Sequence, residues 1–344
     1  MKKLIKFLIA LIFGSVIFYL VIQRAGVETL QEAGRLFFSL KGGLVILTTL
    51  LIAAVGILRW KVVLGCQGEK RKFSELIGVW TVGYSIDYLT PVSLFGGEAL
   101  RAYLTGKTLD IDWEKSFSSV IIDKILDGTF HIIFIIVGVS IFLSYGSFPE
   151  VWIFWLVVLA IFGLSIILAL FYSRAIGKKS ITLLFFKILG LNKTDIKATK
   201  SGEFIFNTEG NVLRFFSPSQ SFFWKGIVLS LLRHLLFYTR ALILVYILVG
   251  SIEPLKSVAI QGLSFLALFL PLPAGLGGLE AVSAFGFETL GFGFEQGTVF
   301  GMNWRAADLV LCLFGVIFGV KIFLITFKLK IFDFIDRVKE VKVD

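Results

Sequence analysis

The chain has 344 residues, of which 57% are hydrophobic and 17% charged, and its formal net charge is +10. This apolar content exceeds that of soluble domains and indicates a membrane protein. Two cysteines and two histidines are too few for a disulfide framework or a zinc cluster. The positive charge is better explained by cytoplasmic loops beside anionic lipid than by nucleic acid. We therefore predict no nucleic-acid partner, no metal and no cofactor.

Long apolar segments predict an all-α polytopic membrane protein, since a spanning helix needs about 20 mostly apolar residues. The first such run follows Lys2, Lys3 and Lys6 and is too long for an ordinary signal peptide. Two further apolar arms, 73–89 and 258–271, lead into segments rich in proline and glycine. Six full spans are predicted at 4–23, 42–58, 117–144, 152–173, 226–249 and 306–327.

The distribution of Lys and Arg in the loops predicts the orientation. The 59–75 connection and the partly amphipathic 174–225 connection are rich in basic residues, which places them and both termini in the cytoplasm. The turn 145–151 has no Lys or Arg and is placed outside. Counting the crossings between loops of assigned side then requires segment 73–104 to enter and leave the membrane on the same side. The same count requires segment 258–292 to enter and leave from the opposite face. We expect two oppositely inserted hairpins in a plasma or inner membrane.

The two hairpin tips resemble each other, which predicts an internal repeat. Pro91 and Pro273 are each followed by Gly at +5, Glu at +7 and Ala at +8. Each half holds three crossings and one hairpin, and an odd number of crossings inverts the second copy. The single transmembrane domain, 1–344, would contain repeats at 1–145 and 151–327. The helix-breaking residues of the tips are Pro91, Gly96, Gly97, Pro273, Gly275, Gly277 and Gly278.

Charged residues also stand where helices are expected to begin. Glu98 and Glu280 open the return arms, where free backbone N–H groups would favour a head-group phosphate. The alternative is that each carboxylate is merely well placed in a first helical turn. Arg305 and Asp308 open the last helix at i, i+3 spacing, either as an interfacial salt bridge or as a head-group gate at the outer surface.

Ionisable residues inside an apolar helix are costly and mark candidate binding sites. Asp123, Asp127 and His131 share one helical face, and Lys124 is predicted to pair with Asp127 at i+3. The alternative for that pair is a structural role in helix packing. His131 is either a proton relay or a hydrogen-bonded core residue.

A second charged face lies in 226–249. Arg233 is expected to snorkel toward the basic side, and His234 is assigned a structural role. Arg240 lies about 20 Å along its helix, near mid-membrane, and needs a partner from elsewhere. Glu98, Glu280 or an anionic ligand are the candidate partners.

Three stretches, "YLTPVSLFGGEALRAYL", "VIIDKILD" and "LPLPAGLGGLEA", resemble in this order the lysylphosphatidylglycerol synthase transmembrane-domain family, also called flippase-like integral membrane proteins. The chain departs mildly from the family pattern, with Ala274 and Gly275 where a Gly pair is usual, Leu279 before the Glu, and Lys124 where Arg is common. The matching positions are Pro91, Gly97, Glu98 and Arg101, then Asp123, Lys124 and Asp127, then Pro273, Gly275, Gly277, Gly278 and Glu280.

The resemblance implies a function in lipid translocation. Family members that synthesise lysyl-lipid carry a soluble aminoacyl-transferase domain after this region, whereas this chain ends at Asp344. We therefore expect the translocating part and no enzymatic activity, with membrane lipids as partners and a homo-oligomer left open. The alternatives are a small-solute secondary transporter and a lipid-modifying enzyme or scaffold.

The main hypothesis is that a lipid with an anionic or zwitterionic head group moves between leaflets through a polar cavity lined by both tips. Basic residues would hold the phosphate, and acidic residues would balance them or contact a cationic group. The predicted substrate-binding residues are Glu98, Arg101, Asp123, Lys124, Asp127, Arg240, Glu280 and Arg305.

Overall fold

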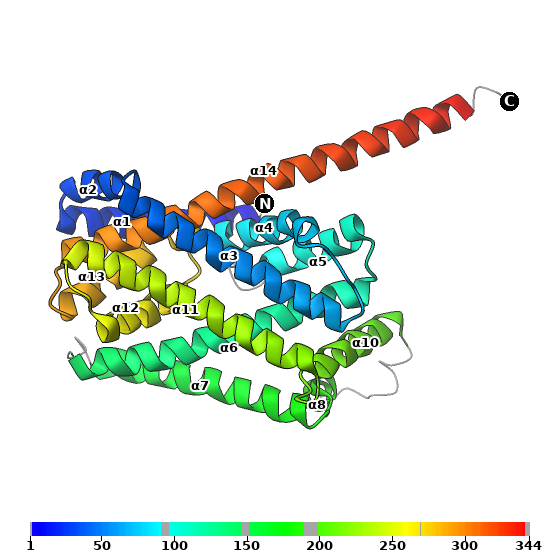
Figure 1. The fold of residues 1–344 in the computed structure, drawn as a ribbon, viewed down its shortest axis with the longest axis horizontal. Coiled ribbons are helices and arrows are strands. Elements are labelled where there is room, and N and C mark those ends of the chain that lie inside the picture. The colour runs from blue at the N-terminus through cyan, green and yellow to red at the C-terminus, as the bar shows by residue number, and fades with distance from the viewer. Residues whose placement is uncertain (1, 91–95, 146–150, 189–198, 269, 341–344) are drawn as a thin grey trace.

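The computed structural model describes residues 2–90, 96–145, 151–188, 199–268 and 270–340, and its secondary structure there is helical (Figure 1). In chain order the helices are α1 (Lys2–Ala25), α2 (Glu28–Phe37), α3 (Leu40–Cys66), α4 (Phe73–Leu89), α5 (Gly96–Leu109), α6 (Trp113–Tyr145), α7 (Val151–Ile176), α8 (Ile181–Ile188), α10 (Lys200–Phe215), α11 (Ser221–Val249), α12 (Pro254–Ala267), the 3₁₀ turn η1 (Pro273–Gly275), α13 (Gly278–Thr289) and α14 (Phe294–Glu340).

Long apolar helices confirm the all-α polytopic membrane fold. α7 has 26 residues and contains the predicted span 152–173, but its apolar part, Ile161–Ile176, is shorter than a full span. Five other helices of the described chain are long and apolar enough to cross a membrane, at Phe7–Ala25, Leu40–Cys66, Trp113–Tyr145, Ser221–Val249 and Phe294–Leu324.

The third helix is longer than predicted. Ser39 caps its start, because the Ser39 hydroxyl accepts a 3.2 Å hydrogen bond from the Gly42 N–H. The helix then continues through Arg59 to Cys66, so the predicted end at residue 58 was wrong. Arg59 is only 1% exposed. The charge of Arg59 predicts the start of a loop, whereas in the structure Arg59 is a buried part of the helix.

Both proline-containing segments form helical hairpins, α4–α5 and α12–α13. Pro91 lies outside the described residues, and α5 begins at Gly96 as expected. In the second tip, Gly275 and Gly277 have φ of +63° and +76°, a region that favours glycine. A Cβ on Gly277 would also collide with the backbone of α1 at Gly14. The depth of the hairpins in the membrane stays a prediction.

The helices pack in a duplicated pattern. α3 lies against α11, α6 packs on the hairpin helix α12, and α14 packs on the hairpin helix α4 (Figure 1). At one of these contacts a Cβ on Gly138 would lie 2.8 Å from the Cα of Gly262. At the other, Ser85 donates a 2.9 Å hydrogen bond to the Cys312 carbonyl. Close approach through small residues is typical of membrane helices. Exchanging α3–α6 with α11–α14 leaves this pattern unchanged, as two repeats would require.

Candidate functional site

A cavity of about 210 Å³ lies where α3, α4, α5, α6 and α11 meet, with α12 and α14 completing its wall. Aromatic side chains, including Trp80, Tyr84 and Trp304, form part of the lining. The remaining lining is unusually rich in charge for the interior of a helix bundle. The ionisable side chains other than tyrosine that line it are Arg59, Asp87, Glu98, Arg101, Asp123, Lys124, Asp127, His131, Arg233 and Asp308.

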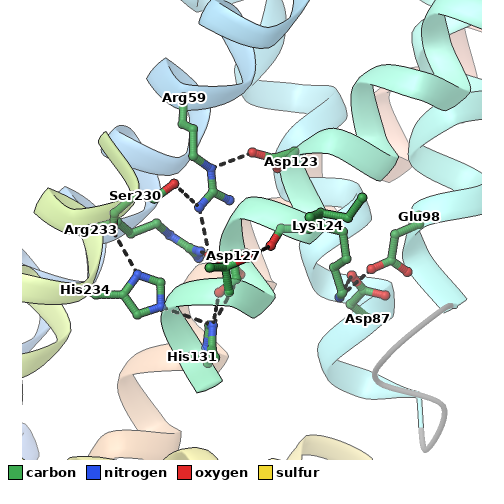
Figure 2. Close-up of polar contacts among 12 residues, drawn as sticks. Arg59, Asp87, Glu98, Asp123, Lys124, Asp127, His131, Ser230, Arg233 and His234 are labelled. Atoms are coloured by element: carbon green, nitrogen blue, oxygen red, sulfur yellow. Dashed lines mark hydrogen bonds and ion pairs between the residues drawn. The ribbon is translucent and has the colours of Figure 1, made fainter. Parts of the chain in front are cut away.

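One end of the cavity, which we call the acidic end, consists of Asp87, Glu98 and Lys124 (Figure 2). The Lys124 ammonium contacts the Glu98 carboxylate and lies 3.6 Å from Oδ2 of Asp87. The N–H of Gly97, in the first turn of α5, donates a 2.7 Å hydrogen bond to Oδ1 of Asp87. Two carboxylates therefore share one ammonium, and this end has a formal charge of −1.

A second cluster of charged lining residues, which we call the basic end, consists of Arg59, Arg101, Arg233, Asp123 and Asp127. Arg59 bridges both aspartates, at 2.7 Å to Asp123 and 3.0 Å to Asp127. Arg101 donates to the other oxygen of Asp123 at 2.8 Å, and Arg233 pairs with Asp127. Three guanidinium groups face two carboxylates, so this end has a formal charge of +1. Among the described residues, Nε and Nη2 of Arg101 and Nε of Arg233 have no hydrogen-bond partner.

Two histidines adjoin the basic end. Nε2 of His234 lies 3.1 Å from Nδ1 of His131, and His131 lies one turn after Asp127 on α6 (Figure 2). Ligand atoms of these three residues lie within 4.8 Å of one another, as a metal site would need. The same Asp127 carboxylate already binds the guanidinium groups of Arg59 and Arg233. Their positive charge opposes a divalent cation, so the arrangement does not fit a metal.

Behind the cavity wall, Arg240 is completely buried. It donates hydrogen bonds of 2.7 Å to Asp308 on α14 and 2.9 Å to Thr49 on α3. The face of Trp304 lies 3.8 Å from its guanidinium carbon, a cation–π contact. Asp308 lines the cavity, but its charge is already neutralised by this buried partner.

Glu280 and Arg305 form a separate ion pair at the second hairpin, 2.8 Å apart. The other oxygen of Glu280 accepts a 2.9 Å hydrogen bond from the Gly277 N–H, which caps the first turn of α13. Glu280 is fully buried, and Phe18 of α1 covers Arg305 at 5.0 Å. Neither charged residue lines the cavity. The capping alternative therefore describes what Glu280 does in this structure.

Five of the eight predicted substrate-binding residues surround the cavity, and three do not. Arg240 lies behind the wall, and Glu280 and Arg305 lie apart from it. The expectation that both hairpin glutamates line one chamber was therefore wrong. The five that surround it are Glu98, Arg101, Asp123, Lys124 and Asp127.

The predicted charge pairings were also wrong. Lys124 pairs with Glu98 and Asp87 rather than with Asp127. Arg305 and Asp308 do not pair with each other, since each binds a residue of another helix. Arg233 does not snorkel but is buried against Asp127. In each case a partner on a facing helix takes precedence over the neighbour along the chain.

Sequence reasoning missed two charged residues that line the cavity, Arg59 and Asp87. Arg59 follows a long apolar run, 44–58, without any Pro, Asn, Asp or Ser, a signal that the helix continues through it. Asp87 lies within the apolar arm 73–89, where an unpaired carboxylate would be costly. His234, assigned a structural role, hydrogen-bonds to His131 at the cavity wall.

Long apolar helices packed around a charge-rich cavity define a multi-pass membrane protein. The chain belongs to the family described as the lysylphosphatidylglycerol synthase transmembrane region, whose family model matches residues 4–315. This confirms the resemblance seen in the three sequence stretches.

The chain is also similar to two archaeal proteins named UPF0104 membrane proteins. It is 24% identical to one from Methanocaldococcus jannaschii over 252 residues, which covers 70% of this chain and 71% of the relative. It is 37% identical to one from Methanothermobacter thermautotrophicus over 87 residues, 25% of each chain. No solved structure matches the chain.

Proposed function

We propose that this protein translocates a phospholipid between the leaflets of a membrane, with the head group passing through the cavity. The separation of charge within the cavity carries this proposal. The phosphate binds at the basic end, where Arg101 and Arg233 have unpartnered N–H groups. A head-group ammonium binds at the acidic end, where Asp87 and Glu98 share Lys124. The phosphate contacts are charge-assisted hydrogen bonds.

The cavity's size supports a head group rather than a whole lipid. Its volume of about 210 Å³ is below the range of pockets that enclose drug-sized ligands. A phospholipid would therefore leave its acyl chains in the bilayer while the polar group crosses. The chain's family is named after the transmembrane region of lysylphosphatidylglycerol synthase, an enzyme that modifies a lipid. This membership supports a lipid as the cargo.

The proposal includes the arrangement in the membrane. α4–α5 and α12–α13 are re-entrant hairpins of two inverted repeats, and both termini face the cytoplasm of a plasma or inner membrane. The duplicated contacts of α6 with α12 and of α14 with α4 support the repeats. The excess of Lys and Arg in 59–75 and 174–225 supports the orientation.

Reconstitution into liposomes tests the function. Lipids labelled on an acyl chain are incorporated, the outer leaflet is bleached with an impermeant reductant, and the lost fluorescence reports lipids that crossed. We expect bleaching beyond one half of the label with the wild type. Arg101→Gln should slow crossing by roughly 10-fold to 100-fold, because a charge-assisted contact to the phosphate is lost.

A matched control is Arg24→Gln, since Arg24 also forms an ion pair but its side chain is 61% exposed. This control should cross lipids at the wild-type rate. If the wild-type protein leaves the labelled lipid in its leaflet but transports a soluble phosphate ester, the protein is a small-solute transporter. The appearance of a new lipid species by mass analysis would make it an enzyme.

A further inference from the structure

The two histidines at the basic end have hydrogen-bond partners that assign their neutral tautomers. Nδ1 of His234 lies 2.9 Å from the Ser230 carbonyl oxygen, and Nδ1 of His131 lies 2.8 Å from the Asp127 carbonyl oxygen. A carbonyl only accepts, so both Nδ1 atoms carry a hydrogen. Nε2 of His234 is then a lone-pair acceptor facing the Nδ1–H of His131 at 3.1 Å. An added proton would therefore go to Nε2 of His131, a residue that lines the cavity.

The net charge of the cavity indicates what a proton on His131 would do, namely compensate the charge of an anionic head group. The acidic end carries −1 and the basic end +1, and Asp308 is neutralised by Arg240, so the cavity is formally neutral. A zwitterionic head group keeps this balance. A phosphodiester whose head group carries no amine brings in one uncompensated negative charge, which is costly away from water. Among side chains, histidine is the one whose unperturbed pKa lies near neutrality.

We propose that His131 is a proton-binding site that couples entry of an anionic head group to uptake of one proton. The inference rests on the proposed function and adds a coupling ion to it. The imidazolium balances the phosphate at the basic end, where Asp127 lies within 3.8 Å of the ring. A zwitterionic lipid enters without any proton. The transport of anionic lipid alone is therefore driven by a proton gradient.

The groups around His131 fit this role. Phe265 and Gln261 of α12 are neutral, and Phe265 packs on the ring with 4.3 Å between centroids. Tyr172 of α7 is bound to Thr129 on the neighbouring part of α6. Because the nearby carboxylates are already paired, His131 is neutral until a phosphate arrives. Asp127 lies 3.8 Å from Nδ1 of His131. The other charged side chains that line the same cavity are Asp123 and Lys124 on α6, Arg233 on α11, Arg59 on α3, Asp87 on α4, Glu98 and Arg101 on α5, and Asp308 on α14.

Proton uptake on lipid binding tests the proposal. The purified full chain in detergent with EDTA is titrated with short-chain phosphatidylglycerol or phosphatidylethanolamine. Calorimetry is repeated in two buffers that differ in ionisation enthalpy, so the number of protons taken up is measured directly. We expect about one proton per bound phosphatidylglycerol near pH 7 and none per phosphatidylethanolamine. Raising the pH should weaken phosphatidylglycerol binding by up to about tenfold per unit, because the complex holds the extra proton.

Variants locate the proton. His131→Gln should abolish uptake and remove the pH dependence, whereas His234→Gln should keep both. Binding of phosphatidylglycerol without uptake by the wild type, or uptake that persists in His131→Gln, overturns the inference while the proposed function stands. If proton uptake is lost in Asp87→Asn but kept in His131→Gln, the proton binds at the acidic end, and this result also overturns the inference. If neither lipid binds, the proposed function fails and the inference fails with it.

Discussion

Arg59 on α3 donates a 2.7 Å hydrogen bond to Asp123 on α6. The second half repeats the relationship, because Arg240 on α11 donates over 2.7 Å to Asp308 on α14. Each half thus ties its second span to its third through a buried arginine and aspartate. Both residues of the first pair line the cavity, whereas in the second pair, which we call the closed pair, Asp308 lines it and Arg240 lies behind its wall.

The closed pair should be a stability element. Removing one partner leaves an uncompensated buried charge, so we expect Arg240→Ala or Asp308→Ala to lower the free energy of unfolding by about 3–5 kcal/mol. The double variant Arg240→Leu with Asp308→Leu should lose less than either single variant. Thermal unfolding in detergent measures this. Equal losses from the exposed control Glu288→Ala would contradict the assignment.

The two hairpin glutamates should separate by phenotype. Glu98→Gln should slow lipid crossing by tenfold or more with little change in stability, because Glu98 lines the cavity and meets Lys124 there. Glu280→Gln should instead lower the free energy of unfolding by about 1–3 kcal/mol, since the buried Arg305 loses its counter-charge. Crossing rates and unfolding midpoints of the two variants are compared. Identical behaviour would mean that the glutamates have the same role.

The second tip should require glycine for two reasons that can be separated. Gly277→Ala places a side chain at φ +76° and against the backbone of α1, whereas Gly291→Ala has φ +80° with open space around it. Gly291→Ala should cost about 1–2 kcal/mol from the backbone alone. Gly277→Ala should cost about 1–3 kcal/mol more from overpacking. Unfolding midpoints that match in the two variants would disprove the close contact with α1.

The contact between α6 and α12 should tolerate no added methyl group. Gly138→Ala would put a Cβ 2.8 Å from the Cα of Gly262, and we expect a loss of about 1–3 kcal/mol. Gly163→Ala on α7 is the matched control, with no atom within 4 Å of the new Cβ. It should be neutral or slightly stabilising, as Ala favours a helix. Unfolding followed by intrinsic tryptophan fluorescence distinguishes the two.

Much of the fold could be predicted from the sequence because the bilayer imposes a length of apolar helix on each span. The broken hairpins could be predicted from Pro91, Pro273 and the glycines that follow. The end of α3 could not, since Arg59 reads as a loop residue until Asp123 and Asp127 are known to face it.

The candidate site was predictable in part. Asp123, Lys124 and Asp127 could be found because charge within a span is costly and therefore conspicuous. Their partners could not, because spacing along one helix ranks only the neighbours on that helix. Which helix faces Lys124 depends on packing, and packing supplies Glu98 and Asp87.

The close packing of α6 against α12 determines which parts of the protein are connected through the cavity. Since Gly138 and Gly262 bring the two backbones together, the charges carried by α6 lie on a helix that is closely packed against the second hairpin. Glu98 and Arg101 belong to the first hairpin and bind Lys124 and Asp123 across the boundary. These ion pairs therefore connect the first hairpin, through α6, to the second hairpin.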